Sequence, residues 1–405
     1  MVIDNKDKKV IKSSIERGQN ELACSAEREK IKGSKNLNVP HLRFTEFSGE
    51  WKEELLDRIA TLSKGIGIPK EQLSEDGDPC ILYGELYTKY KSEIIKQVES
   101  KTDIDGSKLK RSKANDVIIP CSGETAVDIA TARCVPFDSI LLGGDLNVIS
   151  LHKYDGAFMS YQLNGKRKYD IARVAQGVSV VHLYGEHLKT IKTYNPTLPE
   201  QQKIAILLSL LDERIATQNK IIEKLQSLIK GLAAQLTQSG TPNVRLCDCL
   251  ECHSSTLQEN CVSATGSYPV YGATGLIGYT NGYAYNGESI LIVKDGSGVG
   301  SLSYANDCYS VIGTLNYLTA KGKYSVLYLY YALMAFNFTP YITGMAIPHI
   351  YFKDYGKAKV FCPSIENQIR IASLLHNIEQ KLVVEQNLII SLSAQKSYLL
   401  RMLFI

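Results

Sequence analysis

An internal repeat constrains this chain more than any other feature of its sequence. Shifting the sequence by 167 residues aligns a long stretch with itself without gaps, and shorter matches extend upstream with small changes of offset. The aligned pairs include Gly177 with Gly344, His182 with His349, Tyr184 with Tyr351, Gln201 with Gln368 and Leu208 with Leu375. Because solenoid units have only roughly 20–45 residues, this period predicts two related modules instead of a repeat array.

Each copy ends in a segment whose apolar residues recur in alternating steps of four and three. Ten positions from Ile204 to Leu236 follow these steps, and Gln218 is the single polar one. Such a 3.5-residue period predicts coiled-coil packing. The predicted seam consists of Ile204, Leu208, Leu211, Ile215, Ile222, Leu225, Ile229 and Leu232 in the first copy, and of Ile371, Leu375, Ile378, Leu382, Ile389, Leu392 and Leu399 in the second. The alternative is two amphipathic helices on separate cores, but surface helices rarely keep so narrow a seam.

The rest of each copy has the pattern of a small α+β module. Short β-rich runs such as Asp116–Ile119 and Ser289–Val293 are separated by turn residues, and Leu327–Phe338 is typical of a short helix. The predicted fold class is therefore α+β, with two duplicated globular domains separated by two long helices that pair as an antiparallel coiled coil. The predicted ranges are 1–38 for a polar extension without assigned function, 39–198 for the first domain, 199–240 for the central helix, 241–365 for the second domain and 366–405 for the C-terminal helix.

Composition excludes some classes of protein and leaves others open. Of the 405 residues, 44% are hydrophobic and 22% charged, which excludes a disordered chain. No apolar run reaches the roughly 18 residues that a membrane span needs. The net charge of +4 neither indicates nor excludes nucleic-acid binding, because local patches matter more than the sum. Ten cysteines without an apolar signal core at the N-terminus favour reduced thiols in the cytoplasm.

Cysteines near the start of the second module suggest metal chemistry at first sight. Residues 249–253 have the C-x-x-C-H spacing of a haem attachment site, but that chemistry needs an export signal. A wider set has zinc-ligand residue types, namely Cys247, Cys249, Cys252, His253 and Cys261. The equivalent stretch 56–61 of the first copy has no cysteine. Buried free thiols are therefore the favoured interpretation, and no metal site is expected.

Two further motifs resemble methyltransferase features without completing them. Asp295–Gly300 is a glycine-rich loop after a predicted strand, but Leu302–Ala305 is typical of another strand where a cofactor loop would need a helix. A tight turn between strands is therefore predicted. Residues 195–198 read N-P-T-L and lack the second proline and the aromatic residue of the N-P-P-aromatic motif of amino-methyltransferases. No catalytic residue is predicted in this chain.

The residues at the module boundaries resemble those of one known family. In 39–51, V-P-H-L-R-F followed by a tryptophan resembles the entry into the first target-recognition domain of type I restriction–modification specificity subunits. Segment 83–88 resembles a recurrent part of that domain, and segment 195–212 resembles the start of the family's central helix. The second copy departs from this pattern at Glu366–Gln368, where E-N-Q replaces P-E-Q, and at Glu379, which takes the place of an aspartate.

This resemblance implies a non-catalytic DNA specificity subunit. Each target-recognition domain would read one half of a split double-stranded DNA site, and the paired helices would set the unread gap. Two methyltransferase subunits would bind the pseudo-symmetric body and methylate adenine, and motor–nuclease restriction subunits would join them for ATP-dependent restriction. No cofactor is expected on this chain, because S-adenosylmethionine, ATP and Mg would be bound by the partner subunits.

Candidate DNA contacts follow from where cations and tyrosines occur. Lys and Arg bind phosphates, while side chains in the major groove read bases. The first module offers Lys166, Arg167, Lys168 and Arg173, and the second offers Lys294, Lys321 and Lys323. The second module also holds 15 of the 24 tyrosines, which predicts a recognition surface more than a dry core. The matched glycine turns before His182 and His349 could bring backbone close to a phosphate, and solvated turns are the alternative for all these candidates.

Two other functions stay open at this point. The chain could be a coiled-coil scaffold without a DNA role, and salt-dependent DNA affinity of a purified complex would argue against that. It could also be an S-adenosylmethionine-dependent methyltransferase using the glycine loop near Gly296–Gly300. Absence of binding heat between the isolated chain and S-adenosylmethionine would exclude the second function.

Overall fold

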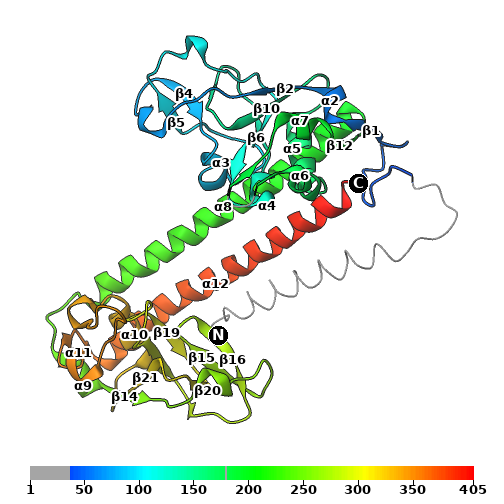
Figure 1. Cartoon of the computed structure of the whole chain (residues 1–405). Helices are drawn as coiled ribbons and strands as arrows, with labels where there is room; N and C mark the ends of the chain where they lie inside the picture. The colour runs from blue at the N-terminus through cyan, green and yellow to red at the C-terminus, as the bar shows by residue number, and fades with distance from the viewer. Residues whose placement is uncertain (1–36, 178–179) are drawn as a thin grey trace. The chain divides into compact units, whose positions relative to one another are not determined.

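The computed structural model describes residues 37–177 and 180–405. Their contacts form two compact units, whose elements are labelled in Figure 1. The first unit comprises the described part of Gly33–Thr217 together with Ile389–Ile405, and the second is Gln218–Leu388. Each unit therefore contains one globular domain and part of both long helices.

A four-stranded antiparallel sheet forms the centre of the first domain. Its order is β2-β10-β6-β8, with β2 at Ala60–Lys64, β10 at Leu146–Leu151, β6 at Asp116–Pro120 and β8 at Arg133–Val135. Strand β6 is apolar from Val117 to Pro120 because both of its faces are covered. Val117 and Ile119 pack toward helix α5 (Gly156–Asn164), while Ile118 packs toward a second, smaller sheet.

Shorter elements complete the first domain. The smaller sheet has the order β3-β5-β4-β9, in which β4 and β9 are parallel. Its strands are β3 (Leu73–Ser74), β5 (Ser100–Thr102), β4 (Asp78–Ile81) and β9 (Leu141–Leu142). The remaining elements are β1 (Lys52–Leu55) paired with β12 (Lys192–Asn195), β7 (Ser122–Gly123) paired with β11 (Val181–His182), and helices α2 (Leu56–Ile59), α3 (Glu85–Thr88), α4 (Ala126–Ile129), α6 (Lys168–Val174) and α7 (Gly185–Lys189).

The second domain repeats this architecture, which confirms the duplication. Its central antiparallel sheet has the order β14-β21-β18-β19, and its smaller sheet has the order β16-β15-β20-β17 with β15 and β20 parallel. The central strands are β14 (Leu250–Ser254), β21 (Leu315–Ala320), β18 (Ser289–Val293) and β19 (Leu302–Ala305). The other elements are β15 (Tyr268–Gly272), β16 (Gly275–Thr280), β17 (Tyr285–Asn286), β20 (Cys308–Val311), β13 (Val244–Arg245) paired with β22 (Lys359–Val360), α9 (Leu246–Cys249), α10 (Val326–Met334) and α11 (Phe352–Tyr355).

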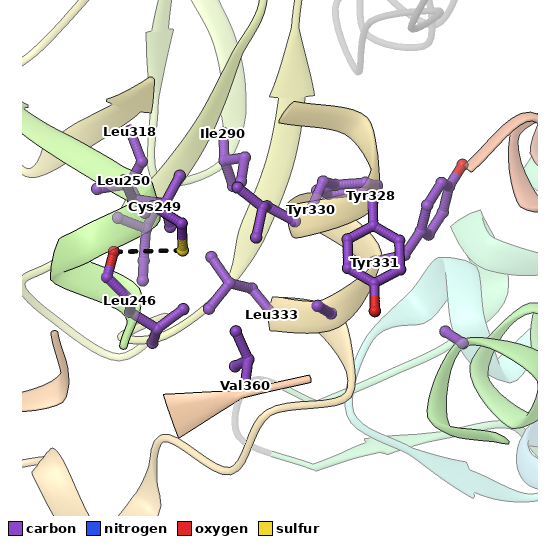
Figure 2. Packing of buried hydrophobic residues seen from close by; sticks show 14 of the residues in the cluster. Leu246, Cys249, Leu250, Ile290, Leu318, Tyr328, Tyr330, Tyr331, Leu333 and Val360 are labelled. Atoms are coloured by element: carbon purple, nitrogen blue, oxygen red, sulfur yellow. Dashed lines mark hydrogen bonds between the residues drawn. The ribbon is translucent and has the colours of Figure 1, made fainter. Parts of the chain in front are cut away.

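Tyrosines fill the second core to an extent that the sequence analysis did not predict. Figure 2 shows Tyr328, Tyr330 and Tyr331 of α10 among the apolar residues of this core. Tyr309 and Tyr355 are buried as well. The expectation of a tyrosine recognition surface is wrong for these five. The hydroxyl of Tyr328 finds an acceptor inside the domain, because it donates to the backbone carbonyl of Phe361 at 2.7 Å.

The two long helices pair antiparallel within each unit. Helix α8 runs from Leu198 to Thr237 and α12 from Ile365 to Met402. Each helix starts one residue before its predicted start and ends three residues before its predicted end. In the first unit, Ile204 and Leu208 of α8 pack with Leu399 of α12 and with Leu403 just beyond its end. In the second, Ile229 and Ala233 pack with Ala372 and Leu375. All fifteen predicted seam residues are buried or half-buried, and their pairing as one seam stays a prediction.

An aromatic cluster closes the first unit around residues beyond the end of α12. Phe404 is fully buried, and its ring centroid lies 6.4 Å from that of Trp51 and 5.2 Å from that of Phe158 on α5. The first domain therefore includes residues from near both ends of the described chain in a single core.

Candidate nucleic-acid interface

A repeated glutamine fixes each domain on its long helix. Gln201 of α8 donates from Nε2 to the carbonyl of Pro196 at 2.8 Å, and its Oε1 accepts from the backbone N–H of Asp155 at 2.9 Å. Gln368 of α12 makes the same contacts with Pro363 at 2.8 Å and with Ser325 at 3.1 Å. Asp155 is the N-cap of α5 and Ser325 is the N-cap of α10. In both units the glutamine therefore connects the start of the long helix to the start of a helix in the globular domain.

On each long helix, a carboxylate about one and a half heptads after this glutamine accepts a hydrogen bond from a tyrosine hydroxyl. Asp212 accepts from Tyr161 of α5 at 2.7 Å, and Glu379 accepts from Tyr331 of α10 at 2.8 Å. The aspartate-to-glutamate departure in the second copy therefore leaves this contact in place.

Only the first unit adds a buried cation to this contact. Lys396 of α12 lies 2.6 Å from carboxylate oxygens of both Asp212 and Glu93, and its side chain is 17% exposed. Burial lowers the pKa of Lys396, but the two carboxylates outweigh burial and leave that pKa raised. The equivalent position in the second unit is the buried Ile229, so the two units differ in charge at matched sites.

The predicted basic segment of the first domain is engaged inside that domain. Arg167 donates to the backbone carbonyl of Ile405 at 2.9 Å, pairs with Asp170 at 3.1 Å and lies over the ring of Tyr194. Burial lowers the pKa of Lys166 and Lys168, which are both half-buried. The fourth candidate, Arg173 on α6, is largely exposed. Arg173 is thus the member of this segment most open to a phosphate, and contact by any of the four stays a prediction.

The predicted lysines of the second domain are not gathered at one place. Lys294 follows β18 and Lys321 follows β21, and these neighbouring strands are antiparallel, so the two lysines lie at opposite ends of the sheet. Lys321 donates from Nζ to the carbonyl of Cys247 at 2.9 Å. Lys323 is exposed and has no ion-pair partner among the residues described.

A basic loop that the sequence analysis missed lies between β5 and β6. Arg111 pairs with Asp78 of β4 at 2.6 Å. The carbonyl of Lys110 accepts from the backbone N–H of Leu142 in β9 at 2.8 Å, so the loop is hydrogen-bonded to the smaller sheet. The other two cations are Lys108 and Lys113, both exposed. Within the described ranges, none of the three lysines has an ion-pair partner. Four cations in six residues were the signal that could have found this loop.

The matched glycine turns have the same hydrogen-bonded base in both domains. Gln176 and His182 exchange two backbone hydrogen bonds at 2.9 and 2.6 Å, and Thr343 and His349 exchange two at 2.9 and 2.8 Å. The backbone of Gly177 has φ +121° and that of Gly344 has φ +91°. A side chain at either glycine would collide with the carbonyl three residues on.

A cavity of about 740 Å³ lies beside the first hairpin, with Val180 on its rim. Its lining includes Tyr83, Tyr87, Asp128 and Arg133. Arg133 is buried and donates to the backbone carbonyls of Tyr90 and Ala132, so its guanidinium is already hydrogen-bonded within the domain. Aromatic walls with an acidic group do not suit a phosphate.

The glycine loop and the cysteines that suggested catalysis or metal binding have structural roles in the second domain. Strands β18 and β19 form an antiparallel hairpin around the glycine loop, which confirms the predicted turn. Burial raises the pKa of Cys252 to about 11, and the thiol of Cys249 donates to the carbonyl of Leu246, as Figure 2 shows. Across the described residues no three His, Cys, Asp or Glu side chains gather as metal ligands would. Nor does any helix in these ranges have the length and apolar character to cross a bilayer.

Comparison with known proteins identifies the family of this fold. The model for the type I restriction modification DNA specificity domain matches the chain twice, at residues 49–227 and 243–394. The chain belongs to the type I restriction–modification specificity-subunit family. Specificity subunits are the non-catalytic components of these systems, and the two matched copies are its target-recognition domains.

Individual relatives agree with this assignment. The specificity subunit of the Escherichia coli type I enzyme EcoprrI is 27% identical over 112 residues, 28% of either chain. A putative type I specificity subunit of Mycoplasma pneumoniae is 30% identical over 138 residues, 32% of this chain and 43% of that one. The matched segments thus span less than half of these curated relatives.

Solved structures share the fold over much more of the chain. The S subunit of a type I system from M. genitalium has a TM-score of 0.65 at 19% identity, and the alignment covers 91% of this chain and 99% of that one. A chain from a structural study of complex assembly in a type I system has a TM-score of 0.51 at 15% identity, with 87% and 97% covered. The α+β duplication with paired helices is therefore the fold of these subunits.

Proposed function

We propose that this specificity subunit reads a bipartite DNA site, with one half-site per target-recognition domain and the α8–α12 pair setting the gap. The observation that carries the proposal is the duplication itself: each domain is fixed by the same glutamine and the same acid–tyrosine contact to one of two antiparallel helices. Two domains held in equivalent ways suit a target with two separated halves.

The chemistry would be supplied by partner subunits in the cytoplasm. Two methyltransferase subunits would use S-adenosylmethionine to methylate adenine, and motor–nuclease subunits would use ATP and Mg for restriction. This division of roles is supported by family membership and by the structural surroundings of the glycine loop and the cysteines.

Phosphate contact in the first domain is best supported for the loop of Lys108, Lys110 and Lys113. Each phosphate neutralised in duplex DNA contributes about 0.9 to the slope of log affinity against log salt. We expect the triple alanine variant to lower that slope by up to about 2.7, because these lysines have no competing ion pair in the described chain. Alanine at the half-buried Lys166 and Lys168 is the matched control and should change the slope less.

The methylation pattern of the cell tests the proposal. The chain would be co-expressed with the methyltransferase subunit of its own locus, and modified adenines would be mapped by single-molecule sequencing. We expect one two-part motif with a fixed gap that disappears when this chain is omitted. A soluble complex that leaves no modified motif would contradict the proposal and favour a scaffold.

Removing one heptad from each helix tests the gap. Residues 215–221 and 382–388 lie opposite each other around the contact between Gln218 and Glu385, and their removal keeps Asp212, Glu379 and Lys396. Seven residues correspond to about 10.5 Å of helix, or about three base pairs. The motif should keep both half-sites with a gap shortened accordingly. Leucine at both Gln218 and Glu385 is the length-neutral control, and an unchanged gap in the deletion variant would refute the ruler.

A further inference from the structure

Two cysteines from opposite ends of the second domain are in contact inside it. Cys249 is the last residue of α9, and Cys362 lies just after β22. Their thiols make a side-chain hydrogen bond to each other. Cys249 is fully buried and Cys362 is 6% exposed. Both belong to the same apolar core, and Figure 2 shows Cys249 among other residues of this core.

The backbone on both sides of this contact is hydrogen-bonded in place. Asn243 binds Cys362 twice: its Oδ1 accepts from the backbone N–H of Cys362 at 2.8 Å, and its Nδ2 donates to the carbonyl of Cys362 at 2.9 Å. At the start of α9, the N–H of Leu246 donates to the carbonyl of Ala358 at 2.9 Å. The native fold therefore already holds together the two segments that a bond between the sulfurs would join.

The first domain has no sulfur at the equivalent positions. Helix α2 ends at Ile59 where α9 ends at Cys249, and the 167-residue offset of the repeat places Asn195 opposite Cys362. Ile59 and Asn195 are both buried. The same fold is thus completed by an aliphatic and an amide side chain, so packing alone does not require two adjacent thiols in the second domain.

The contact makes the two thiols chemically unequal. The hydrogen bond with Cys249 lowers the pKa of Cys362, although burial acts in the opposite direction. The same hydrogen bond, together with burial, raises the pKa of Cys249. The thiolate is the form of cysteine that reacts with a peroxide. Cys362, which is also the more exposed of the two, is therefore the cysteine that should react first.

We infer that Cys249 and Cys362 form a redox modification site, at which hydrogen peroxide converts the two thiols to a disulfide. This inference goes beyond the proposed function and does not rest on it. The Cys362 thiolate attacks one peroxide oxygen, the O–O bond breaks, and the other oxygen leaves as water once protonated. The sulfur of Cys249 then attacks the sulfenic acid of Cys362, which forms the S–S bond and releases the second water. Two thiols are oxidised and one peroxide is reduced to two waters.

The disulfide would join the two connections between the second domain and its long helices. Segment 238–249 leads from the end of α8 through α9, and segment 359–364 leads from β22 to the start of α12. Because the two cysteines are far apart in the sequence, their bond would close a long loop and restrict the unfolded chain. We expect oxidation to raise the melting temperature of the second unit by roughly 4–16 °C and to leave that of the first unchanged.

Peptide mapping of the oxidised protein tests this inference. The native full chain would be treated with hydrogen peroxide, blocked with N-ethylmaleimide and digested without reductant. Mass spectrometry should find the peptides of Cys249 and Cys362 joined, and dithiothreitol should separate them. In Cys249→Ser, dimedone should trap a sulfenic acid on Cys362, whereas in Cys362→Ser the thiol of Cys249 should stay reduced. Cys252→Ser, which changes the next cysteine along the chain, is the control and should leave the cross-link in place.

Three results with the wild type would overturn the inference. The first is that both thiols remain open to alkylation when the peroxide-treated protein is unfolded. The second is that either cysteine becomes joined to a different cysteine. The third is that the cross-link forms only after the protein has been unfolded in urea. Since these three results need no substitution, they decide the question even if a serine variant does not fold.

Discussion

Replacing Lys396 by methionine is expected to destabilise the first unit selectively. The ammonium group lies 2.6 Å from both Asp212 and Glu93, whose side chains are only 7% and 10% exposed. Methionine fills a similar volume but leaves two buried carboxylates without their cation. Removing one member of a buried ionic cluster costs about 3–5 kcal/mol. For a unit of this size that corresponds to a fall in melting temperature of roughly 6–20 °C.

Hydrogen exchange followed by mass spectrometry would localise the effect. Peptides from α5 in the first unit should lose protection, while peptides from α10 in the second should not. Ile229→Met is the matched control, because it places the same side chain at the repeat-equivalent position without changing charge. The combination of K396M with Glu93→Gln and Asp212→Asn should recover more than half of the loss, since neither of these two positions then holds an uncompensated negative charge.

The pH dependence gives an independent check. Because the pKa of Lys396 is raised in the folded state, its contribution is fully present below the unfolded pKa of about 10.4 and is lost as pH rises through the folded pKa. The stability difference between the wild type and K396M should therefore be constant from pH 7 to 9 and shrink only above about pH 10. A K396M protein as stable as the wild type, or a triple variant no better than K396M, would refute the ionic explanation.

Two further predictions concern other buried groups. Gln201→Ala should destabilise the first unit and Gln368→Ala the second, each by about 1–3 kcal/mol for each buried backbone group left unsatisfied. Urea unfolding followed by unit-specific hydrogen exchange would measure both effects. An effect in only one unit would show that the repeated contact is not equivalent. Alkylation at pH 8 should modify the exposed Cys261 and spare Cys80 and Cys134 until unfolding, because burial raises the pKa of these two thiols to about 11 and about 12. Early labelling of Cys80 or Cys134, detected by peptide mapping, would contradict this.

The long helices were predictable because their signal is local and periodic. A seam that repeats every 3.5 residues can be seen in the sequence, and Pro199 with Glu200 marks a helix start at almost the right residue. The duplication was visible for a similar reason, since each copy serves as a reference for the other. Equivalent residues such as Gln201 and Gln368 then proved to make equivalent contacts.

The side-chain surroundings were not predictable because they depend on distant residues. Arg167 looks free in the sequence but is satisfied by Ile405, which lies 238 positions away. Tyr331 looks like a surface residue until Glu379 of a separate helix accepts its hydroxyl. The basic loop around Lys110 was missed because it lies between the matched segments, where the two copies differ in length and the repeat gives no guidance.

The closure of the first unit by Phe404 has a consequence for how the protein is made. A ribosome releases the segment 51–158 long before it releases residues 389–405, so the nascent first domain holds Trp51 and Phe158 without their final neighbour while the whole second domain is being synthesised. The second domain meets no such delay, because all of Gln218–Leu388 is contiguous. A frameshift or premature stop near residue 389 would therefore disable the first domain, and the second domain, encoded beside the lesion, would still fold.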